Sequence, residues 1–203
     1  MTTTHYIGKT ARIAAVLAAT LPKLQQGEGN VINRCLLFTG KPGIGKTDLA
    51  TRLAADISGD ATFAVEYCNG QSCTIEKVRQ WRDTQCYRPL TGTGTGVYLV
   101  DEIDGASLAA CNELRTFLDR LHPGRIFIAT TNKEPNELQE QLQSRFKIYR
   151  FEPVPEHEIA EWLSRTFPIL SPYVALEIAK GVKGNVRAAY ADAVTLLEDL
   201  VIA

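Results

Sequence analysis

The sequence lacks an excess of charge of either sign, which excludes a protein with a basic surface overall. Its 203 residues include 22 Lys and Arg against 23 Asp and Glu, a formal net charge of −1 at pH 7. Because affinity for nucleic acids comes largely from neutralised phosphates, any binding to DNA is expected at a local patch. The composition, 45% apolar and 22% charged, is that of a folded globular protein.

The sequence also has few cysteines and no long apolar run. Its five cysteines form no Cys-x-x-Cys pair, and we interpret them as reduced, buried thiols. A zinc site built on Cys68 and Cys73, completed by Cys86 or Cys111, is the less favoured alternative. The most apolar early stretch, residues 11–21, is too short to span a bilayer. We therefore expect a cytoplasmic protein without membrane contact.

Helical and strand-like patterns alternate up to about residue 151, which is typical of an α/β protein. Strands are expected at 35–38, 63–67, 97–100, 125–130 and 147–151, and helices at 10–23, 46–58, 74–82, 107–121 and 136–143. Loops are expected at 26–30 and, as a flexible Gly/Thr segment, at 91–96. After Pro153 only helices are expected, at about 155–166, 171–180 and 185–201. The sequence thus predicts a five-stranded domain over 1–153 and a small three-helix domain over 154–203.

A glycine-rich segment after the first predicted strand is the most specific pattern in the chain. It fits G-x-x-x-x-G-K-[ST] and consists of Gly40, Lys41, Pro42, Gly43, Ile44, Gly45, Lys46 and Thr47. Glycines let such a loop turn its N–H groups toward phosphate oxygens, and the next helix adds its positive N-terminus. Lys46 is expected to reach the β- and γ-phosphates, and the Thr47 hydroxyl to ligate Mg²⁺. The loop predicts a nucleotide site.

Two acidic residues follow the third predicted strand. Asp101 stands at the carboxyl end of this strand, where a P-loop enzyme places its Mg²⁺-ligating carboxylate. Glu102 is the candidate base that orients the attacking water. This pair favours hydrolysis of the nucleotide over binding alone.

The order and spacing of these motifs resemble those of the AAA+ ATPases. The resemblance is strongest to the clamp-loader branch (replication factor C small subunits and bacterial clamp-loader subunits), and it begins at Ile7-Gly8, which is similar to the family's early Ile-Gly box. It implies that ATP is the nucleotide and that five parallel strands are followed by a helical lid. Phe146 stands where the family's Ser-Arg-Cys box usually has Cys, and no collar-like third domain is expected after the lid.

Three polar residues acquire roles from this resemblance. The strand Ile126-Phe-Ile-Ala-Thr-Thr-Asn132 resembles the one that carries sensor 1, so Asn132 would help to place the lytic water. The segment Leu142-Gln-Ser-Arg-Phe146 implies that Arg145 is an arginine finger inserted into a neighbour's site. The segment Gly184-Asn-Val-Arg187 resembles sensor 2 and implies that Arg187 contacts the γ-phosphate in its own subunit.

The segment from Asn69 to Arg79 resembles the part of clamp loaders that tracks DNA phosphates. It implies DNA backbone contacts from Ser72, Thr74, Lys77 and Arg79. Four cations in residues 71–90 face only two acidic residues of that stretch, which supports a local basic patch. The alternative is a solvated amphipathic helix anchored by Trp81.

Two functions follow as hypotheses. The first is a clamp-loader-like ATPase that acts on DNA in replication, repair or mobile-element maintenance and works in a homo- or hetero-oligomer, with a sliding clamp or a transposition protein as a further partner. The second is a nucleotide-dependent switch with slow ATP turnover, which recruits a partner as a helicase loader or transposition regulator does. A P-loop small-molecule kinase is disfavoured, because it leaves Glu102, Asn132 and Arg145 without roles.

Overall fold

The core of the computed structural model, which describes residues 6–27 and 29–202, is a parallel five-stranded sheet. Its order is β2-β3-β4-β1-β5. The strands are β1 (Cys35–Thr39), β2 (Val65–Asn69), β3 (Gly96–Asp101), β4 (Arg125–Thr131) and β5 (Lys147–Arg150). The helices are α1 (Gly8–Gln25), α2 (Val31–Arg34), α3 (Lys46–Ser58), α4 (Ile75–Thr84), α5 (Leu108–Asp119), α6 (Glu140–Gln143), α7 (Glu156–Thr166), α8 (Pro172–Gly181) and α9 (Val186–Ile202). The predicted α/β class with five parallel strands is confirmed.

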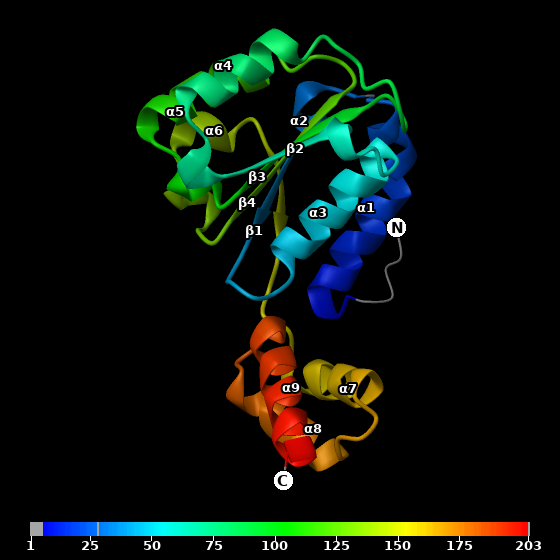
Figure 1. The fold of residues 1–203 in the computed structure, drawn as a ribbon. Helices are drawn as coiled ribbons and strands as arrows, with labels where there is room; N and C mark the ends of the chain where they lie inside the picture. Colours follow the sequence, from blue (N-terminus) through cyan, green and yellow to red (C-terminus); the bar gives the residue numbers. More distant parts are fainter. Residues whose placement is uncertain (1–5, 28, 203) are drawn as a thin grey trace.

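The sheet is covered on both faces, as the apolar runs of its central strands require. Leu36 and Phe38 of β1 pack toward the cluster that includes α1 and α3, whereas Leu37 packs toward α4 and α5. Figure 1 shows α4, α5 and α6 on one side of the sheet and α1 and α3 on the other. This double cover leaves the two ends of the strands as the accessible edges of the sheet.

The second strand begins two residues later than the sequence pattern predicts. Phe63, the first residue of the predicted strand, lies in a 3-10 turn and is 98% exposed. The strand proper runs beside β3 in register, with Val65 opposite Val97 and Asn69 opposite Asp101. Pairing with a neighbour, which a single segment cannot reveal, fixes this boundary.

The predicted helix 136–143 is also wrong in its first half. Pro135–Glu137 form a 3-10 turn closed by a capping box between Glu134 and Glu137, and Leu138 is then extended. Only Glu140–Gln143 form an α-helix. The short helix α2 follows the predicted loop at 26–30 and has no counterpart among the predicted elements.

The Gly/Thr-rich loop 91–96 is tied to the body by its threonines. Thr93 donates from its hydroxyl to the carbonyl of Ile57 at 2.6 Å and from its amide to that of Ser58 at 3.1 Å. Thr95 donates to the carbonyl of Gln25 at 2.5 Å. These bonds set the point at which the chain enters β3.

Two buried arginines hold the amino edge of the sheet, where the strands begin. Arg34 is 5% exposed and Arg125 is 8% exposed. The Arg34 guanidinium donates to the main-chain oxygens of Gly29, Leu121, His122 and Arg125. Arg125 donates to those of Thr84, Gln85 and Tyr87, and its guanidinium carbon lies 5.4 Å from the centre of the Tyr98 ring. Carbonyl oxygens thus replace the water that these cations would otherwise need.

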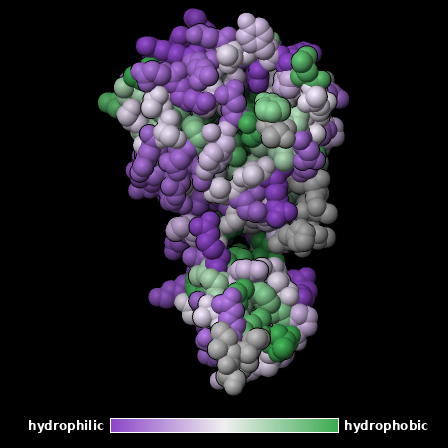
Figure 2. Space-filling model, viewed as in Figure 1, coloured by the Kyte–Doolittle hydropathy of each residue, from purple (hydrophilic) through white to green (hydrophobic). Residues whose placement is uncertain are grey.

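Helices α7, α8 and α9 form a smaller lobe with a hydrophobic cluster of its own, which we call the lid. Figure 2 shows this lobe below the body and joined to it by a narrower waist. Apolar residues gather on the visible face of the lid, while the body above it is largely hydrophilic. The division into domains at 153 and 154 stays a prediction. Within the described ranges, none of the helices has the length and apolarity needed to cross a membrane.

Candidate nucleotide site

Residues 40–47 connect β1 to α3 and form an open loop at the carboxyl edge of the sheet. Gly43 and Gly45 have φ values of +78° and +93°, which side chains rarely adopt. The first helical bond of α3 runs from the Leu49 amide to the Gly45 carbonyl at 3.0 Å. The amides before Leu49 in the first turn therefore have no acceptor within the helix, and Gly45, at the N-cap, has no side chain to cap them. Such a terminus fits a phosphate group.

The Lys46 side chain is held over this loop by three oxygen atoms. Its amine donates to the carbonyls of Gly40 and Lys41, both at 2.8 Å, and to Oδ1 of Asn132 at 2.9 Å. Burial lowers the pKa of Lys46 to about 8, although the Asp101 carboxylate opposes this shift. Burial thus disfavours the charged amine, and a negative charge in addition to that of Asp101, such as a phosphate supplies, would stabilise it.

Asp101 and Thr47 meet directly, although 54 residues separate them. The Thr47 hydroxyl donates to Oδ1 of Asp101 at 2.8 Å, and the Thr130 hydroxyl donates to the same oxygen. A carboxylate and a hydroxyl at this spacing are hard oxygen ligands and fit Mg²⁺, which keeps several waters when it binds beside phosphates. The chemistry of these donors is compatible with the predicted metal.

Glu102 occupies a strained position immediately after β3. Its φ and ψ of +52° and +54° lie in the left-handed region, which is uncommon for residues other than glycine. Its amide donates to the Thr130 hydroxyl at 3.0 Å, and the Asn132 amide donates to its Oε1 at 3.1 Å. These bonds hold the Glu102 carboxylate beside the mouth of the phosphate loop.

Body and lid enclose a cavity of about 620 Å³ whose walls include the phosphate loop, Glu102, Asn132 and Arg187. The lid is joined to the loop by the main chain, because the Arg187 amide donates to the Gly43 carbonyl at 3.1 Å. A Cβ on Gly43 would lie 1.9 Å from Oδ1 of Asn185. The structure thus brings the predicted Arg187 to the same cavity as the loop.

Sequence reasoning missed several residues of this site. Thr130 contacts both Asp101 and Glu102, and Asn185 packs on the phosphate loop. Trp162 and Tyr190 of the lid line the cavity, and their ring centres lie 6.3 Å apart. The position of Thr130 two residues before Asn132 could have indicated its role; the lid residues follow only from the tertiary fold.

Arg145 lies at the other edge of the sheet from this cavity. It precedes β5, whose first residue, Lys147, is level with Leu36 near the start of β1. The five residues of β1 rise about 3.3 Å each, so roughly 15 Å separates the two edges. Arg145 therefore cannot reach the phosphate loop of its own chain.

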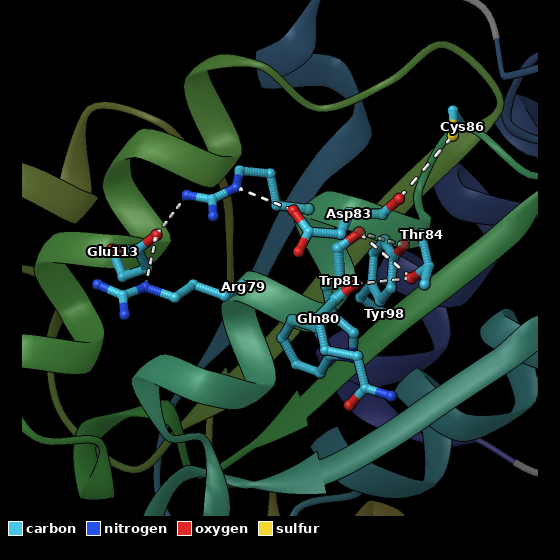
Figure 3. Close-up of polar contacts among 9 residues, drawn as sticks. Arg79, Gln80, Trp81, Asp83, Thr84, Cys86, Tyr98 and Glu113 are labelled. Atoms are coloured by element: carbon cyan, nitrogen blue, oxygen red, sulfur yellow. Dashed lines mark hydrogen bonds and ion pairs between the residues drawn. The ribbon is translucent and has the colours of Figure 1, made fainter.

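The cations of α4 each face a carboxylate from another element. The Lys77 amine lies 3.6 Å from Oε2 of Glu66, and the Arg79 guanidinium lies 3.7 Å from Oε1 of Glu113. Figure 3 shows Arg79 of α4 pointing toward Glu113 of α5, which a second arginine of α4, Arg82, also approaches at 2.8 Å. The count of charges within residues 71–90 misses both partners, because they lie outside that stretch.

The remaining two predicted DNA contacts cap the local backbone. Ser72 bonds with the main chain of Asn69, and the Thr74 hydroxyl accepts from the Lys77 amide at 3.3 Å. Both residues are exposed at the start of α4. Their contact with DNA stays a prediction.

The cysteines give no support to a zinc site. Cys35, Cys68, Cys73 and Cys111 are buried, and Cys86 is exposed. Among residues 6–27 and 29–202, no group of three His, Cys, Asp or Glu side chains could hold a metal ion. All five are free thiols in the structure, and the expectation that they are buried is wrong for Cys86.

A family model described as the ATPase family associated with various cellular activities (AAA) matches residues 36–154. The chain belongs to this AAA family of ATPases. The matched range starts in β1 and ends just before α7, the first helix of the lid. It therefore includes every residue of the phosphate loop. The predicted membership in the AAA+ ATPases is confirmed.

Curated relatives of this AAA ATPase support the clamp-loader resemblance. It is 31% identical over 129 residues to the replication factor C small subunit of Methanococcus maripaludis, covering 62% of this chain and 41% of that protein. It is 32% identical over 159 residues to replication factor C subunit 3 of Saccharomyces cerevisiae, covering 75% of this chain and 46% of that protein. The chain thus spans less than half the length of these relatives.

Solved structures share the fold of this AAA ATPase. A RuvB variant of Thermotoga maritima superimposes with a TM-score of 0.77 at 21% identity, covering 97% of this chain and 64% of that one. Domain III of the replication initiation protein DnaA from the same organism gives 0.72 at 18% identity, covering 99% and 89%. At this level of identity the likeness concerns the fold alone.

Proposed function

We propose that the chain binds ATP with Mg²⁺ and hydrolyses it between the carboxyl edge of the sheet and the lid. The observation that carries this proposal is the hydrogen-bonded set Lys46–Asn132–Glu102 beside the pair Thr47–Asp101. In a P-loop ATPase these are the groups that bind phosphate, metal and water. AAA family membership supports nucleotide binding independently.

Each residue has a defined task in this proposal. Residues 40–47 bind the phosphates through their amides, and Lys46 exchanges its three oxygen acceptors for phosphate oxygens. Glu102 accepts a proton from the attacking water, and Asn132 keeps the Glu102 carboxylate aimed at that water. Thr47 and Asp101 would hold Mg²⁺, which when bound neutralises negative charge on the β- and γ-phosphates. Arg187 supplies positive charge from the lid.

We infer further that the protein works as an oligomer in which Arg145 acts on a neighbour. The roughly 15 Å length of β1 separates Arg145 from its own phosphate loop. An arginine supplied from another subunit stabilises charge on the transferred phosphoryl group and is worth about 10³–10⁵ in rate. Whether the neighbours are copies of this chain or different proteins is decided by the solution mass.

We propose a DNA-associated role in replication, repair or mobile-element maintenance, as a clamp-loader-like ATPase with a sliding clamp as a further partner. The names of the curated relatives support this role. DNA would contact α4 through its backbone phosphates. A nucleotide-dependent switch that recruits a replication or transposition protein is the second candidate, and it is favoured by the pairing of the α4 cations with Glu66 and Glu113.

One experiment separates these possibilities. The mass in solution and the rate of ATP turnover are measured with and without Mg²⁺ and primed DNA, over a range of protein concentrations. Mg²⁺-dependent turnover that rises per subunit with concentration, together with a mass increase in ATP, is the expected result. Stimulation by DNA supports the clamp-loader-like role, whereas stimulation by a protein partner alone supports the switch. Turnover that is linear down to the lowest concentration contradicts the trans role of Arg145.

A further inference from the structure

The turn after β3 carries a further carboxylate, Asp104, which the proposed reaction does not use. Asp104 follows Glu102 by two residues in the 3-10 turn Ile103–Gly105, and Ile103 between them is buried. The Gly105 amide donates to the Glu102 carbonyl at 2.8 Å and closes this turn. The main chain of Asp104 is therefore fixed relative to that of Glu102.

The Asp104 carboxylate binds the end of β4. The Thr131 hydroxyl donates to Oδ1 of Asp104 at 2.7 Å, although 27 residues separate the two. Thr131 is the last residue of β4 and is fully buried, so its hydroxyl proton needs an acceptor within the protein. The same hydroxyl accepts from the Lys133 amide at 3.1 Å and closes a turn around Asn132. Asp104 thus orients the hydroxyl on which this turn depends.

Two neighbouring threonines of β4 hold the segment after β3 at separate points. The Thr130 hydroxyl accepts from the Glu102 amide at 3.0 Å, and Thr131 binds the Asp104 carboxylate. These contacts lie before and after the left-handed backbone of Glu102, whose φ is +52°. A residue other than glycine keeps such a conformation only where its surroundings fix it. Asp104 is therefore one of the groups that fix the Glu102 backbone.

Glu102 and Asn132, the two residues that these contacts fix, are bonded to each other. Nδ2 of Asn132 donates to Oε1 of Glu102 at 3.1 Å, and Oδ1 of Asn132 accepts from the Lys46 amine at 2.9 Å. Both Glu102 and Asn132 line the cavity of about 620 Å³, whereas Asp104 does not. The pair Asp104–Thr131 is thus a second connection between the ends of β3 and β4, set back from the wall of the cavity.

We propose that Asp104 is a positioning residue, which holds Glu102 and Asn132 at their mutual distance by accepting the hydrogen bond from Thr131. This inference rests on the proposed hydrolysis, in which Glu102 accepts a proton from the attacking water. Asp104 touches neither the nucleotide nor that water; it acts through the Thr131 hydroxyl and the turn that follows Glu102. A base that is aligned in advance needs no rearrangement when the reaction begins.

Two substitutions of Asp104 separate its hydrogen bond from its charge. Asp104→Ala removes the acceptor, so in Mg²⁺-dependent ATP turnover we expect kcat to fall at least about 10-fold while nucleotide affinity stays within about threefold. Asp104→Asn keeps an oxygen that can accept from Thr131 and should keep kcat within about threefold of wild type. A fall of less than about threefold for Asp104→Ala, or equal losses for the two variants, overturns the proposal.

The partner hydroxyl supplies an independent test. Thr131→Val keeps the shape of the side chain and removes the donor, so its kcat should fall at least as far as that of Asp104→Ala. A double variant with both changes should fall no further than Thr131→Val alone, because the two changes remove one shared interaction. Losses of kcat that multiply in the double variant would mean that the two residues act separately and would overturn the proposal.

A matched control distinguishes positioning from a merely structural role. Ser107 caps α5 by accepting from the Ala110 amide at 3.2 Å, three residues after Asp104 in the same connection. Ser107→Ala should lower the midpoint of thermal unfolding and leave the kcat of the folded protein unchanged. If Asp104→Ala behaves in the same way, with stability lost and kcat kept, Asp104 only stabilises the fold and the proposal is wrong.

Glu102→Gln and Asn132→Ala distinguish failure of this inference from failure of the hydrolysis on which it rests. If both lose turnover and Asp104→Ala does not, Asp104 has no positioning role and the proposed hydrolysis stands. If both keep full turnover, both proposals are wrong. If both lose turnover, and Asp104→Ala loses it while Asp104→Asn retains it, both proposals are supported.

Discussion

The two edges of the sheet use buried cations in opposite ways. At the carboxyl edge, Lys46 is held by two carbonyls and the Asn132 amide oxygen, all near an open cavity of about 620 Å³. At the amino edge, Arg34 is held by main-chain oxygens with its side chain closed off from solvent. The first cation can exchange its acceptors for a ligand, and the second cannot. The carboxyl edge is suited to binding a ligand, and the amino edge to stabilising the fold.

The largest effect is expected at Glu102. Glu102→Gln removes the proposed base and keeps the size of the side chain, so kcat should fall about 10²–10⁴-fold while nucleotide affinity stays within about threefold. Single-turnover hydrolysis and equilibrium nucleotide binding measure the two quantities. Gln71→Glu changes the charge of an exposed residue and serves as the control. Retained turnover in Glu102→Gln excludes the base role.

Loss of the Lys46 amine should weaken nucleotide binding strongly without unfolding the protein. Lys46→Met is expected to weaken ATP binding about 100-fold, because phosphate oxygens lose a charged donor, while the free energy of unfolding changes by less than about 1 kcal/mol. Calorimetric titration and urea unfolding test the two statements, with Lys180→Met on α8 as the exposed control. A large loss of stability with binding intact would mean that Lys46, like Arg34, stabilises the fold and does not bind the nucleotide.

At the amino edge the reverse outcome is expected. Arg34→Ala leaves several buried carbonyls without a donor, so the free energy of unfolding should fall by about 2–4 kcal/mol. Nucleotide affinity of the remaining folded protein should be unchanged. Urea unfolding measures the loss, and Arg165→Ala at an exposed position of α7 should change stability by less than about 0.5 kcal/mol.

A smaller effect is expected where lid and loop touch. Gly43→Ala meets both an unfavourable φ of +78° and the Asn185 side chain, so nucleotide affinity should fall about 10-fold. Gly94→Ala has a φ of +76° and open space around its Cβ, and it isolates the backbone cost. Removing the clash in a Gly43→Ala, Asn185→Ala double variant should restore part of the affinity. Equal nucleotide affinities for Gly43→Ala and wild type would mean that the contact between lid and phosphate loop does not affect nucleotide binding.

The smallest effect concerns α4. If Lys77 and Arg79 contact phosphates, replacing both by alanine lowers the slope of log affinity for DNA against log salt by about 2. DNA binding with ATP over a salt series measures this slope, and Lys180→Ala is the control. An unchanged slope would mean that Glu66 and Glu113 already neutralise this surface.

The arrangement of the candidate nucleotide site could be predicted from sequence because its groups are set by local spacing. Residues 40–47 form one continuous motif, and Asp101 and Glu102 follow a strand whose apolar run is plain. Strands that run parallel bring their carboxyl ends together, so the meeting of Thr47 with Asp101 follows from the order of the elements. The spacing also placed Asn132 at the same edge.

Contacts between distant elements could not be predicted in this way. The carboxylates that face α4 come from β2 and α5. Asp119, which accepts a hydrogen bond from Nε of Arg145 at 2.8 Å, lies 26 residues before that arginine. Nothing in the spacing of these residues marks them as pairs. The predicted start of β2 is wrong for the same reason, because it depends on pairing with β3, which lies about 30 residues later in the chain.

The bond between Arg187 and Gly43 makes the lid a lever arm. It attaches the first turn of α9 to the phosphate loop, and the 17 residues of α9 extend about 25 Å from that fulcrum. A tilt of roughly 10° at the loop would swing the far end of the helix by about 4 Å. A small tilt at the phosphate loop would thus displace the far end of α9 by about the width of a side chain, at a surface that a neighbouring molecule can contact.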